Sequence, residues 1–205
     1  MPKYIVLEGI DGAGTTTQAK NIWREFANFA FVFEPSDLPI GKLIKDHYLK
    51  NDLYNKKAEA WRVIYLFMAD RIDNIQTKVI PKLQENYNVI GDRGYYSTIA
   101  YEGALGANVD DIIEIINKLV NDNIILKPDL TIILDLDVNI TLERINSRNN
   151  CKEKFEKNKF LETVRHHYLK MHEYFPNENI VYIDANRTEN EVFEDIKSKI
   201  KEVLI

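Results

Sequence analysis

The amino-acid sequence predicts an α/β protein whose five-stranded parallel sheet is flanked by helices on both faces. Short apolar segments alternate along the chain with longer stretches of helical periodicity, as in parallel sheets whose strands are joined by helices. The first apolar segment also runs through a glycine-rich turn, residues 9–14, directly into a helical stretch. Because such sheets bind ligands at the carboxyl ends of their strands, we expect the functional groups to gather there.

The expected strands are short and rich in apolar residues, and most of them end in an acidic residue. In chain order they are 3–8, 29–34, 87–92, 129–135 and 179–184.

The expected helices lie between these strands and after the last one. Pro39 suits a first helical turn, Asn108 is placed to cap, and Pro81 is expected to kink the long third helix or end it early. The helical stretches are 16–27, 39–49, 57–85, 109–120, 139–147, 156–174 and 188–203.

Composition predicts one soluble domain spanning residues 1–205. With 45% apolar residues, a chain of 205 residues is long enough to bury one core. The single cysteine, Cys151, excludes an internal disulfide, and neither a signal peptide nor an apolar run of ~20 residues is seen. We therefore expect a cytoplasmic protein without a membrane partner. A net charge of −5 argues against a general nucleic-acid binder but leaves room for a local anion site.

The segment "EGIDGAGTTTQ" (8–18) is similar to the phosphate-binding motif GxxxxGK[ST]. Gly9, Gly14 and Thr16 occupy motif positions, whereas Thr15 stands where the lysine is usual. Backbone N–H groups of such a loop can surround phosphate oxygens, the following helix adds its positive dipole end, and the Thr16 hydroxyl can reach Mg²⁺. An ordinary glycine turn is the alternative. The segment thus predicts a site for ATP and Mg²⁺.

Asp92 and Arg93 follow the third expected strand, so they should face the same crevice as the glycine-rich loop. The guanidinium of Arg93 suits an acceptor phosphate because it donates two charge-assisted hydrogen bonds. A surface ion pair is the alternative for these two residues.

Several segments, in this order and spacing, resemble the thymidylate kinase family, whose members phosphorylate dTMP from ATP. They are "LEGIDGAGTTTQ" (7–18), "YLFMADR" (65–71), "VIGDRGYYSTIAYEG" (89–103), "PDLTIILDLD" (128–137) and "ERINSR" (143–148). The resemblance covers nearly the whole chain and is weakest at 35–60. It implies a P-loop kinase fold, a small mobile lid at about 148–157, a magnesium requirement and, commonly, a homodimer.

The resemblance also implies roles for individual residues. The implied catalytic residues are Asp11, Asp92, Arg93 and Arg148. The implied ATP-binding residues are Gly9, Ile10, Asp11, Gly12, Ala13, Gly14, Thr15, Thr16, Thr17, Arg144 and Arg187. The implied dTMP-binding residues are Glu34, Phe67, Arg71, Arg93, Ser97, Thr98, Tyr101 and Glu102. The implied metal ligands are Thr16 and Asp92.

Within this set, the resemblance places Asp11 near the sugar 3′-hydroxyl and Tyr101 against the 2′ position. It also implies that the Phe67 ring stacks on the base and that Arg71 donates a hydrogen bond to the base. Taken alone, Phe67 and Tyr101 are also typical of packed core residues. Arg71 lies in a very apolar helix, so its charge needs a polar partner. Asp70, Asp73 and the ligand are the three candidates for that partner.

For the ATP site, the resemblance implies that Arg144 stacks on adenine and that Arg187 belongs to the loop that closes over that base. Arg148, Lys152 and Lys154 fall where lids of this type carry arginines, although a basic run is usually a solvated face. His166, His167 and His172 do not show the spacing of a zinc site.

Three departures from the family pattern bear on function. Thr15 replaces the P-loop lysine, Phe33 and Ser36 flank Glu34-Pro35 where an arginine is common, and Glu102 replaces a glutamine. Two alternatives therefore stay open: a deoxynucleoside kinase that uses Glu34 as its base, and a nucleotide-binding protein with little turnover because of Thr15.

Overall fold

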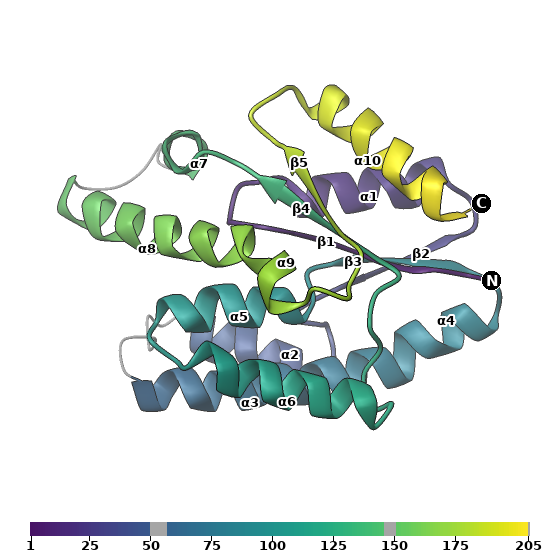
Figure 1. Ribbon diagram of the computed structural model, residues 1–205, viewed down its shortest axis with the longest axis horizontal. Helices are drawn as coiled ribbons and strands as arrows, with labels where there is room; N and C mark the ends of the chain where they lie inside the picture. The colour runs from purple at the N-terminus through teal and green to yellow at the C-terminus, as the bar shows by residue number, and fades with distance from the viewer. Residues whose placement is uncertain (50–56, 146–150, 205) are drawn as a thin grey trace.

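The computed structural model describes residues 1–49, 57–145 and 151–204 and contains a five-stranded, all-parallel sheet (Figure 1). The strand order is β2-β3-β1-β4-β5, which confirms the predicted α/β class. Each strand lies within one residue of its expected bounds at either end. The strands are β1 (Tyr4–Gly9), β2 (Phe29–Phe33), β3 (Asn88–Asp92), β4 (Leu130–Asp135) and β5 (Ile180–Asp184).

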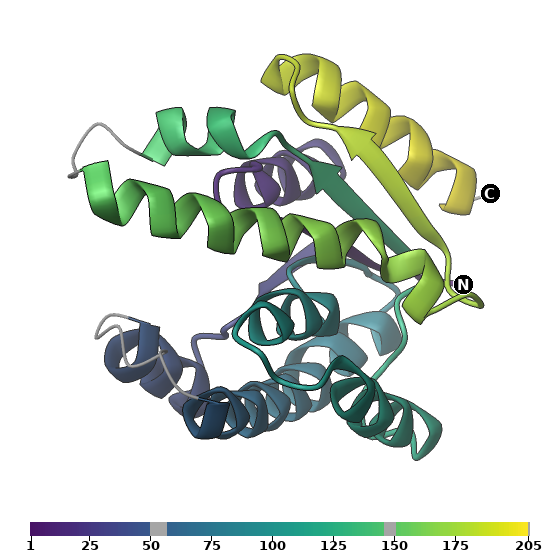
Figure 2. The same ribbon diagram turned by 60° about the vertical axis from the view of Figure 1, so that its left-hand side comes forward.

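Helices cover both faces of this sheet. The helices α1 (Thr15–Glu25) and α10 (Glu189–Leu204) pack together on one face, while α3 (Lys57–Asn74), α5 (Tyr95–Ala104) and α6 (Val109–Asn121) lie on the other (Figure 1). The remaining segments are α2 (Pro39–Leu43), the π-helical segments η1 (Ile44–Leu49) and η2 (Ile75–Val79), α4 (Ile80–Gln84), α7 (Val138–Ile145), α8 (Cys151–Leu169) and α9 (Met171–Tyr174). In Figure 2, α8 runs between α7 and α5 and contacts both. No helix of the described residues is long and apolar enough to cross a membrane.

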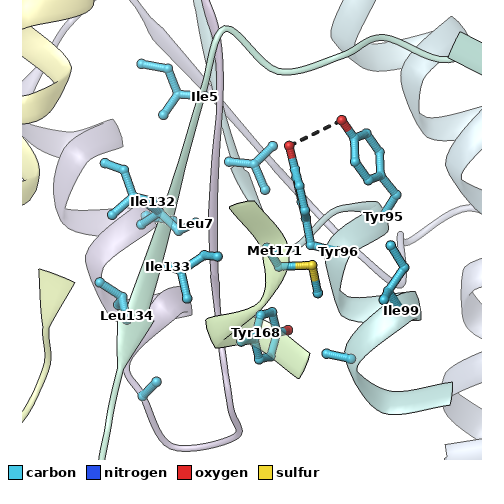
Figure 3. Packing of buried hydrophobic residues seen from close by; sticks show 14 of the residues in the cluster. Ile5, Leu7, Tyr95, Tyr96, Ile99, Ile132, Ile133, Leu134, Tyr168 and Met171 are labelled. Atoms are coloured by element: carbon cyan, nitrogen blue, oxygen red, sulfur yellow. Dashed lines mark hydrogen bonds between the residues drawn. The ribbon is translucent and has the colours of Figure 1, made fainter. Parts of the chain in front are cut away.

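The core is centred on β1, which is buried along its whole length because it lies in the middle of the sheet. Figure 3 shows Leu7 of β1 and Ile133 of β4 beside Tyr96 of α5 and Tyr168 of α8. All four side chains belong to one cluster of buried apolar residues. The face of the sheet that carries α5 and α8 is therefore closely packed right up to the strand ends.

Helix α5 has no counterpart among the helices expected from the sequence. Its buried residues are spread around the helix, so the segment lacks the alternation of polar and apolar faces that predicts a surface helix. They are Tyr95, Tyr96, Thr98, Ile99, Ala100 and Glu102. Burial on several sides by β1, α3, α6 and α8 explains why the pattern was not visible.

The other helices differ from expectation mainly at their ends. Helix α8 begins at Cys151, five residues before the expected start at 156. The long third helix passes through Pro81 and continues to Gln84, so the expectation of an early end was wrong; the turn before Pro81 is π-helical. Asn108 caps α6 as predicted, with its side-chain oxygen accepting from the Asp110 N–H at 2.9 Å.

The strand order places Asp92 beside the glycine-rich loop at residues 9–14, which we call the P-loop. β1 and β3 are neighbours, but the chain leaves β1 through α1 toward β2 and leaves β3 through α5 and α6 toward β4. Such a reversal opens a crevice at the carboxyl ends of the two strands, which is where parallel sheets bind ligands.

Candidate active site

The P-loop connects β1 to α1 and presents an open helix N-terminus. Gly9 is required at the start because a Cβ there would lie 2.8 Å from the Leu134 carbonyl oxygen of β4. Gly14, at the N-cap, has a left-handed φ of 96° and supplies no side-chain cap. The first N–H groups of α1 are thus free of a side-chain cap and can bind an anion, which fits the predicted phosphate site.

Thr16 and Asp92 meet across the crevice. The Thr16 hydroxyl donates to Oδ2 of Asp92 at 2.5 Å, while Oδ1 of Asp92 is buried and accepts no hydrogen bond from the described residues. A buried carboxylate oxygen without a partner beside a hydroxyl fits Mg²⁺, which takes few protein oxygens and completes its shell with water and phosphate. Among the residues described, no group of three or more His, Cys, Asp and Glu side chains could hold a metal, so a cage made by protein alone is not seen.

Arg93 lies directly against the P-loop. Its Nη1 donates to the Gly9 carbonyl oxygen at 2.8 Å and to the Ser97 and Tyr168 hydroxyls at 3.1 and 3.2 Å. Its Nη2 donates to Oδ1 of Asp11 at 2.8 Å. The surface ion-pair alternative does not describe this residue, because its side chain is only 19% exposed and is held by groups from three segments.

Asp11 and Tyr101 contact each other at the same edge. The Tyr101 hydroxyl donates to Oδ1 of Asp11 at 2.9 Å and accepts from the Asp11 N–H at 3.0 Å. The Tyr101 ring also faces the Arg93 guanidinium, 5.3 Å from the ring centroid. The structure thus brings together the two residues that the resemblance places around the sugar.

Glu8 is a site residue that sequence reasoning missed. It is fully buried at the end of β1, where its carboxylate accepts from the Gly94 N–H at 2.7 Å, the Ser97 hydroxyl at 2.5 Å and the Tyr168 hydroxyl at 3.0 Å. The signal was available, since an acid in an otherwise apolar central strand must be buried with partners. Burial raises the pKa of Glu8 from 4.5 to about 7, although Arg93 and the hydrogen bonds oppose this.

This raised pKa predicts a pH dependence of stability. The titratable side chains that interact with the Glu8 carboxyl are Arg93, Tyr168 and, on the same strand, Tyr4. Because the folded protein holds a proton on Glu8 more tightly than the unfolded chain, stability is expected to fall by roughly 3 kcal/mol as the pH rises from about 4.5 to about 7. Glu8→Gln should flatten this part of the melting-temperature profile measured between pH 4.5 and 8. Glu178→Gln is the matched control, because it removes another carboxylate that is bonded by tyrosine hydroxyls, those of Tyr95 and Tyr96. Parallel profiles for wild type and Glu8→Gln would contradict the assignment.

Arg71 forms a buried ion pair with Glu34 of the segment after β2. Their side chains are 1% and 4% exposed, with Nη2 of Arg71 2.7 Å and Nε 3.0 Å from Oε2 of Glu34. Nη2 also donates to the Gly94 carbonyl oxygen and the Thr98 hydroxyl, at 3.0 and 3.1 Å. The two acidic neighbours considered as partners from the sequence were therefore the wrong ones. Asp70 instead accepts from the Ser36 N–H at 2.7 Å and the Ser36 hydroxyl at 2.5 Å.

The other predicted acceptor residues lie around this pair. Phe67 is half-buried and is not part of the buried apolar cluster, so the core interpretation does not describe it. Thr98 and Glu102 are buried one turn apart on α5, the helix that packs on α3. Phe33, one of the two residues that flank Glu34-Pro35 where the resemblance led us to expect an arginine, lies with the Lys45 ammonium 4.4 Å from its ring centroid. Positive charge is thus present at this strand end despite the substitution.

The predicted adenine and lid residues are not assembled by the described structure. Arg187 bonds the two elements that flank its loop, with Nη2 2.5 Å from Oδ2 of Asp195 on α10 and Nε donating to the Asp184 carbonyl oxygen of β5 at 3.1 Å. Arg148 and the side chains of Arg144, Lys152 and Lys154 lie outside the described residues.

Comparison with known proteins points to one family. The thymidylate kinase family model matches residues 7–196. A probable thymidylate kinase of Pyrobaculum aerophilum is 38% identical over 201 residues, covering 98% of this chain and 97% of that protein. The probable thymidylate kinases of Staphylothermus marinus and Pyrococcus horikoshii are each 36% identical, over 98% of this chain and 96% and 97% of theirs.

Proposed function

This chain belongs to the thymidylate kinase family, and we propose that it transfers the γ-phosphoryl group of ATP to dTMP in the crevice between β1 and β3. The observation that carries the proposal is the contact of Arg93 with the P-loop. A cation for the acceptor phosphate lies within hydrogen-bond distance of the loop that holds the donor phosphates. Transfer of a phosphoryl group depends mainly on such positioning and on charge stabilisation.

On the acceptor side, Arg93 binds the monophosphate, Asp11 and Tyr101 border the sugar, and Phe67 and Arg71 bind the base. Glu34 acts as the fixed counter-ion of Arg71, because its carboxylate is buried and already bound by two guanidinium nitrogens. It is therefore poorly placed to act as the base of a nucleoside kinase. A monophosphate needs no such base, since its second pKa is near ~6 and it is largely ionised at neutral pH.

On the donor side, the P-loop N–H groups and the N-terminus of α1 bind the ATP phosphates. Thr16 and Asp92 would hold Mg²⁺, since the buried Oδ1 of Asp92 accepts no hydrogen bond from the described residues and lies beside the Thr16 contact. When bound, the ion neutralises charge on the phosphate oxygens. The open N-terminus of α1 does not need a lysine at position 15, so ATP binds even with Thr15 in place.

Further properties follow from membership of the family. We propose one kinase domain over residues 1–205, with the lid at about 148–157 carrying Arg148, and adenine held between Arg144 and Arg187. We also propose a cytoplasmic location, where the nucleotides are, and a homodimer.

A coupled assay of ADP release tests the proposed function. With ATP and Mg²⁺, dTMP is expected to give ADP release well above that seen with thymidine or without an acceptor. Preference for thymidine over dTMP would overturn the proposal in favour of a nucleoside kinase. An ADP release that no monophosphate increases would instead favour a nucleotide-binding protein.

A further inference from the structure

Glu8 and three residues around it form one hydrogen-bonded unit, which we call the Glu8 cluster: Glu8, Arg93, Ser97 and Tyr168. The Ser97 and Tyr168 hydroxyls both donate to Oε2 of Glu8, at 2.5 and 3.0 Å, and lie 2.8 Å from each other. Both hydroxyls also accept from Nη1 of Arg93. The guanidinium is therefore oriented by two hydroxyls that Glu8 in turn orients.

The cluster also fixes the turn that carries Arg93. Oε1 of Glu8 accepts from the N–H groups of Gly94 and Ser97, at 2.7 and 3.3 Å, at the start of α5. Arg93 itself has a left-handed φ of 73°, which is unfavourable for a residue with a side chain and needs support from its surroundings. Glu8 supplies that support from the strand that leads into the P-loop.

Tyr168 joins α8 to the same point. One turn earlier on α8, Arg165 binds Asp135 at the end of β4, with Nε 2.6 Å from Oδ1 and Nη2 2.9 Å from Oδ2. Two polar contacts thus dock α8 on the carboxyl ends of β1, which leads into the P-loop, and of β4, which pairs with β1. Helix α8 is the element whose first residues fall in the proposed lid.

We propose that Glu8 is a positioning residue for phosphoryl transfer, which acts through Ser97 and Tyr168 to hold the Arg93 guanidinium against the P-loop. The inference rests on the proposed function, because it assigns Arg93 to the acceptor phosphate. Glu8 itself precedes the loop and is fully buried, so we expect it to act on the substrates only through its neighbours. Its role is to keep acceptor and donor phosphates at a fixed separation while α8 remains docked.

A second tyrosine–carboxylate cluster in the protein provides the matched control. The hydroxyls of Tyr95 and Tyr96 both donate to Oε2 of Glu178, and neither Arg93 nor a residue of the P-loop takes part in these two bonds. Tyr96 and Tyr168 are both buried tyrosines whose hydroxyls bond a carboxylate, so removing either hydroxyl perturbs packing similarly. Only the Glu8 cluster reaches Arg93.

The experiment compares Tyr168→Phe and Glu8→Gln with Tyr96→Phe and Glu178→Gln in the full chain. Each variant is assayed for kcat and for KM of dTMP and ATP, and dTMP binding is measured by calorimetry. Tyr168→Phe is expected to lower kcat/KM for dTMP at least tenfold with KM for ATP changed less than twofold. Glu8→Gln should show the same pattern, whereas the two control variants should lose thermal stability with kcat and both KM values near wild type.

Each result separates the inference from the function on which it rests. If wild type turns over dTMP but Tyr168→Phe changes only thermal stability, the positioning role is wrong and the function stands. If Tyr168→Phe raises both KM values equally, the cluster acts on the whole fold, which also overturns the inference. If wild type neither binds nor phosphorylates dTMP, the proposed function fails and the inference fails with it. Should Glu8→Gln not fold, Tyr168→Phe decides, because it leaves the buried carboxylate and the ring in place.

Discussion

Replacing Thr15 by lysine is expected to raise kcat by roughly two orders of magnitude. The P-loop of this chain offers N–H groups and a hydroxyl but no cation of its own, and the Arg93 guanidinium that touches the loop is paired with Asp11. A positive charge placed where charge develops during transfer commonly contributes a few kcal/mol, and each 1.36 kcal/mol is tenfold in rate. The coupled ADP assay at saturating ATP and dTMP measures the effect.

Thr15→Met is the control for this substitution, because it brings a long side chain without the charge. Thr15 is only 5% exposed, so a change caused by crowding alone should appear in both variants. A rise in kcat with lysine but not with methionine is the expected outcome. An unchanged kcat in Thr15→Lys would mean that a cation from the proposed lid, Arg148 or Lys154, already reaches the phosphates.

Replacing Arg71 by methionine is expected to lower the free energy of unfolding by about 3–5 kcal/mol, because it leaves a carboxylate buried without its counter-ion. Burial raises the pKa of Glu34 and Arg71 opposes this, so the variant should also protonate Glu34 more readily. The same change should weaken dTMP binding about 10- to 150-fold, since a charged hydrogen-bond partner contributes roughly 1.5–3 kcal/mol, while ATP binding stays near wild type. Denaturant unfolding and calorimetry measure the two effects.

The double variant Glu34→Gln/Arg71→Met separates these two roles. It removes the unpaired charge, so most of the lost stability should return, while the weak dTMP binding should remain. Equal stability of the single and double variants would contradict the importance of the buried pair. Unchanged dTMP affinity in both would remove Arg71 from the base site.

The local sequence pattern was sufficient to predict the position of the P-loop and of the strand that carries Asp92. Gly9, Gly14 and Thr16 fall within eight consecutive residues, at the end of β1, at the N-cap of α1 and in the first turn of α1. A short turn that joins a strand directly to a helix can adopt few conformations, so the local sequence is enough to predict it. The parallel order of the sheet then predicted that Asp92 would face them, and the contact of Thr16 with Asp92 confirms this. These features depend on residues close in sequence or on a general rule of sheet topology.

The partners of Arg71 show where such reasoning fails. Sequence proximity favoured acids on the same helix, but Glu34 lies 37 positions away and reaches Arg71 only because the segment after β2 packs on α3. The helix Tyr95–Ala104 was missed for a related reason, since burial by several elements removes the periodic pattern.

The sequence by itself therefore determined the α/β class, the five strands, the glycine-rich loop between β1 and α1, and the family. Each of these follows from periodicity or from a short motif whose residues act together locally. Only the tertiary structure decided which partners the buried charged groups find: Arg71 with Glu34, Arg93 with Asp11 and the Gly9 carbonyl oxygen, and Glu8 with the Tyr168 hydroxyl of α8. A buried charge must find a partner, but which partner it finds depends on how distant segments pack, and no local pattern in the sequence encodes that choice.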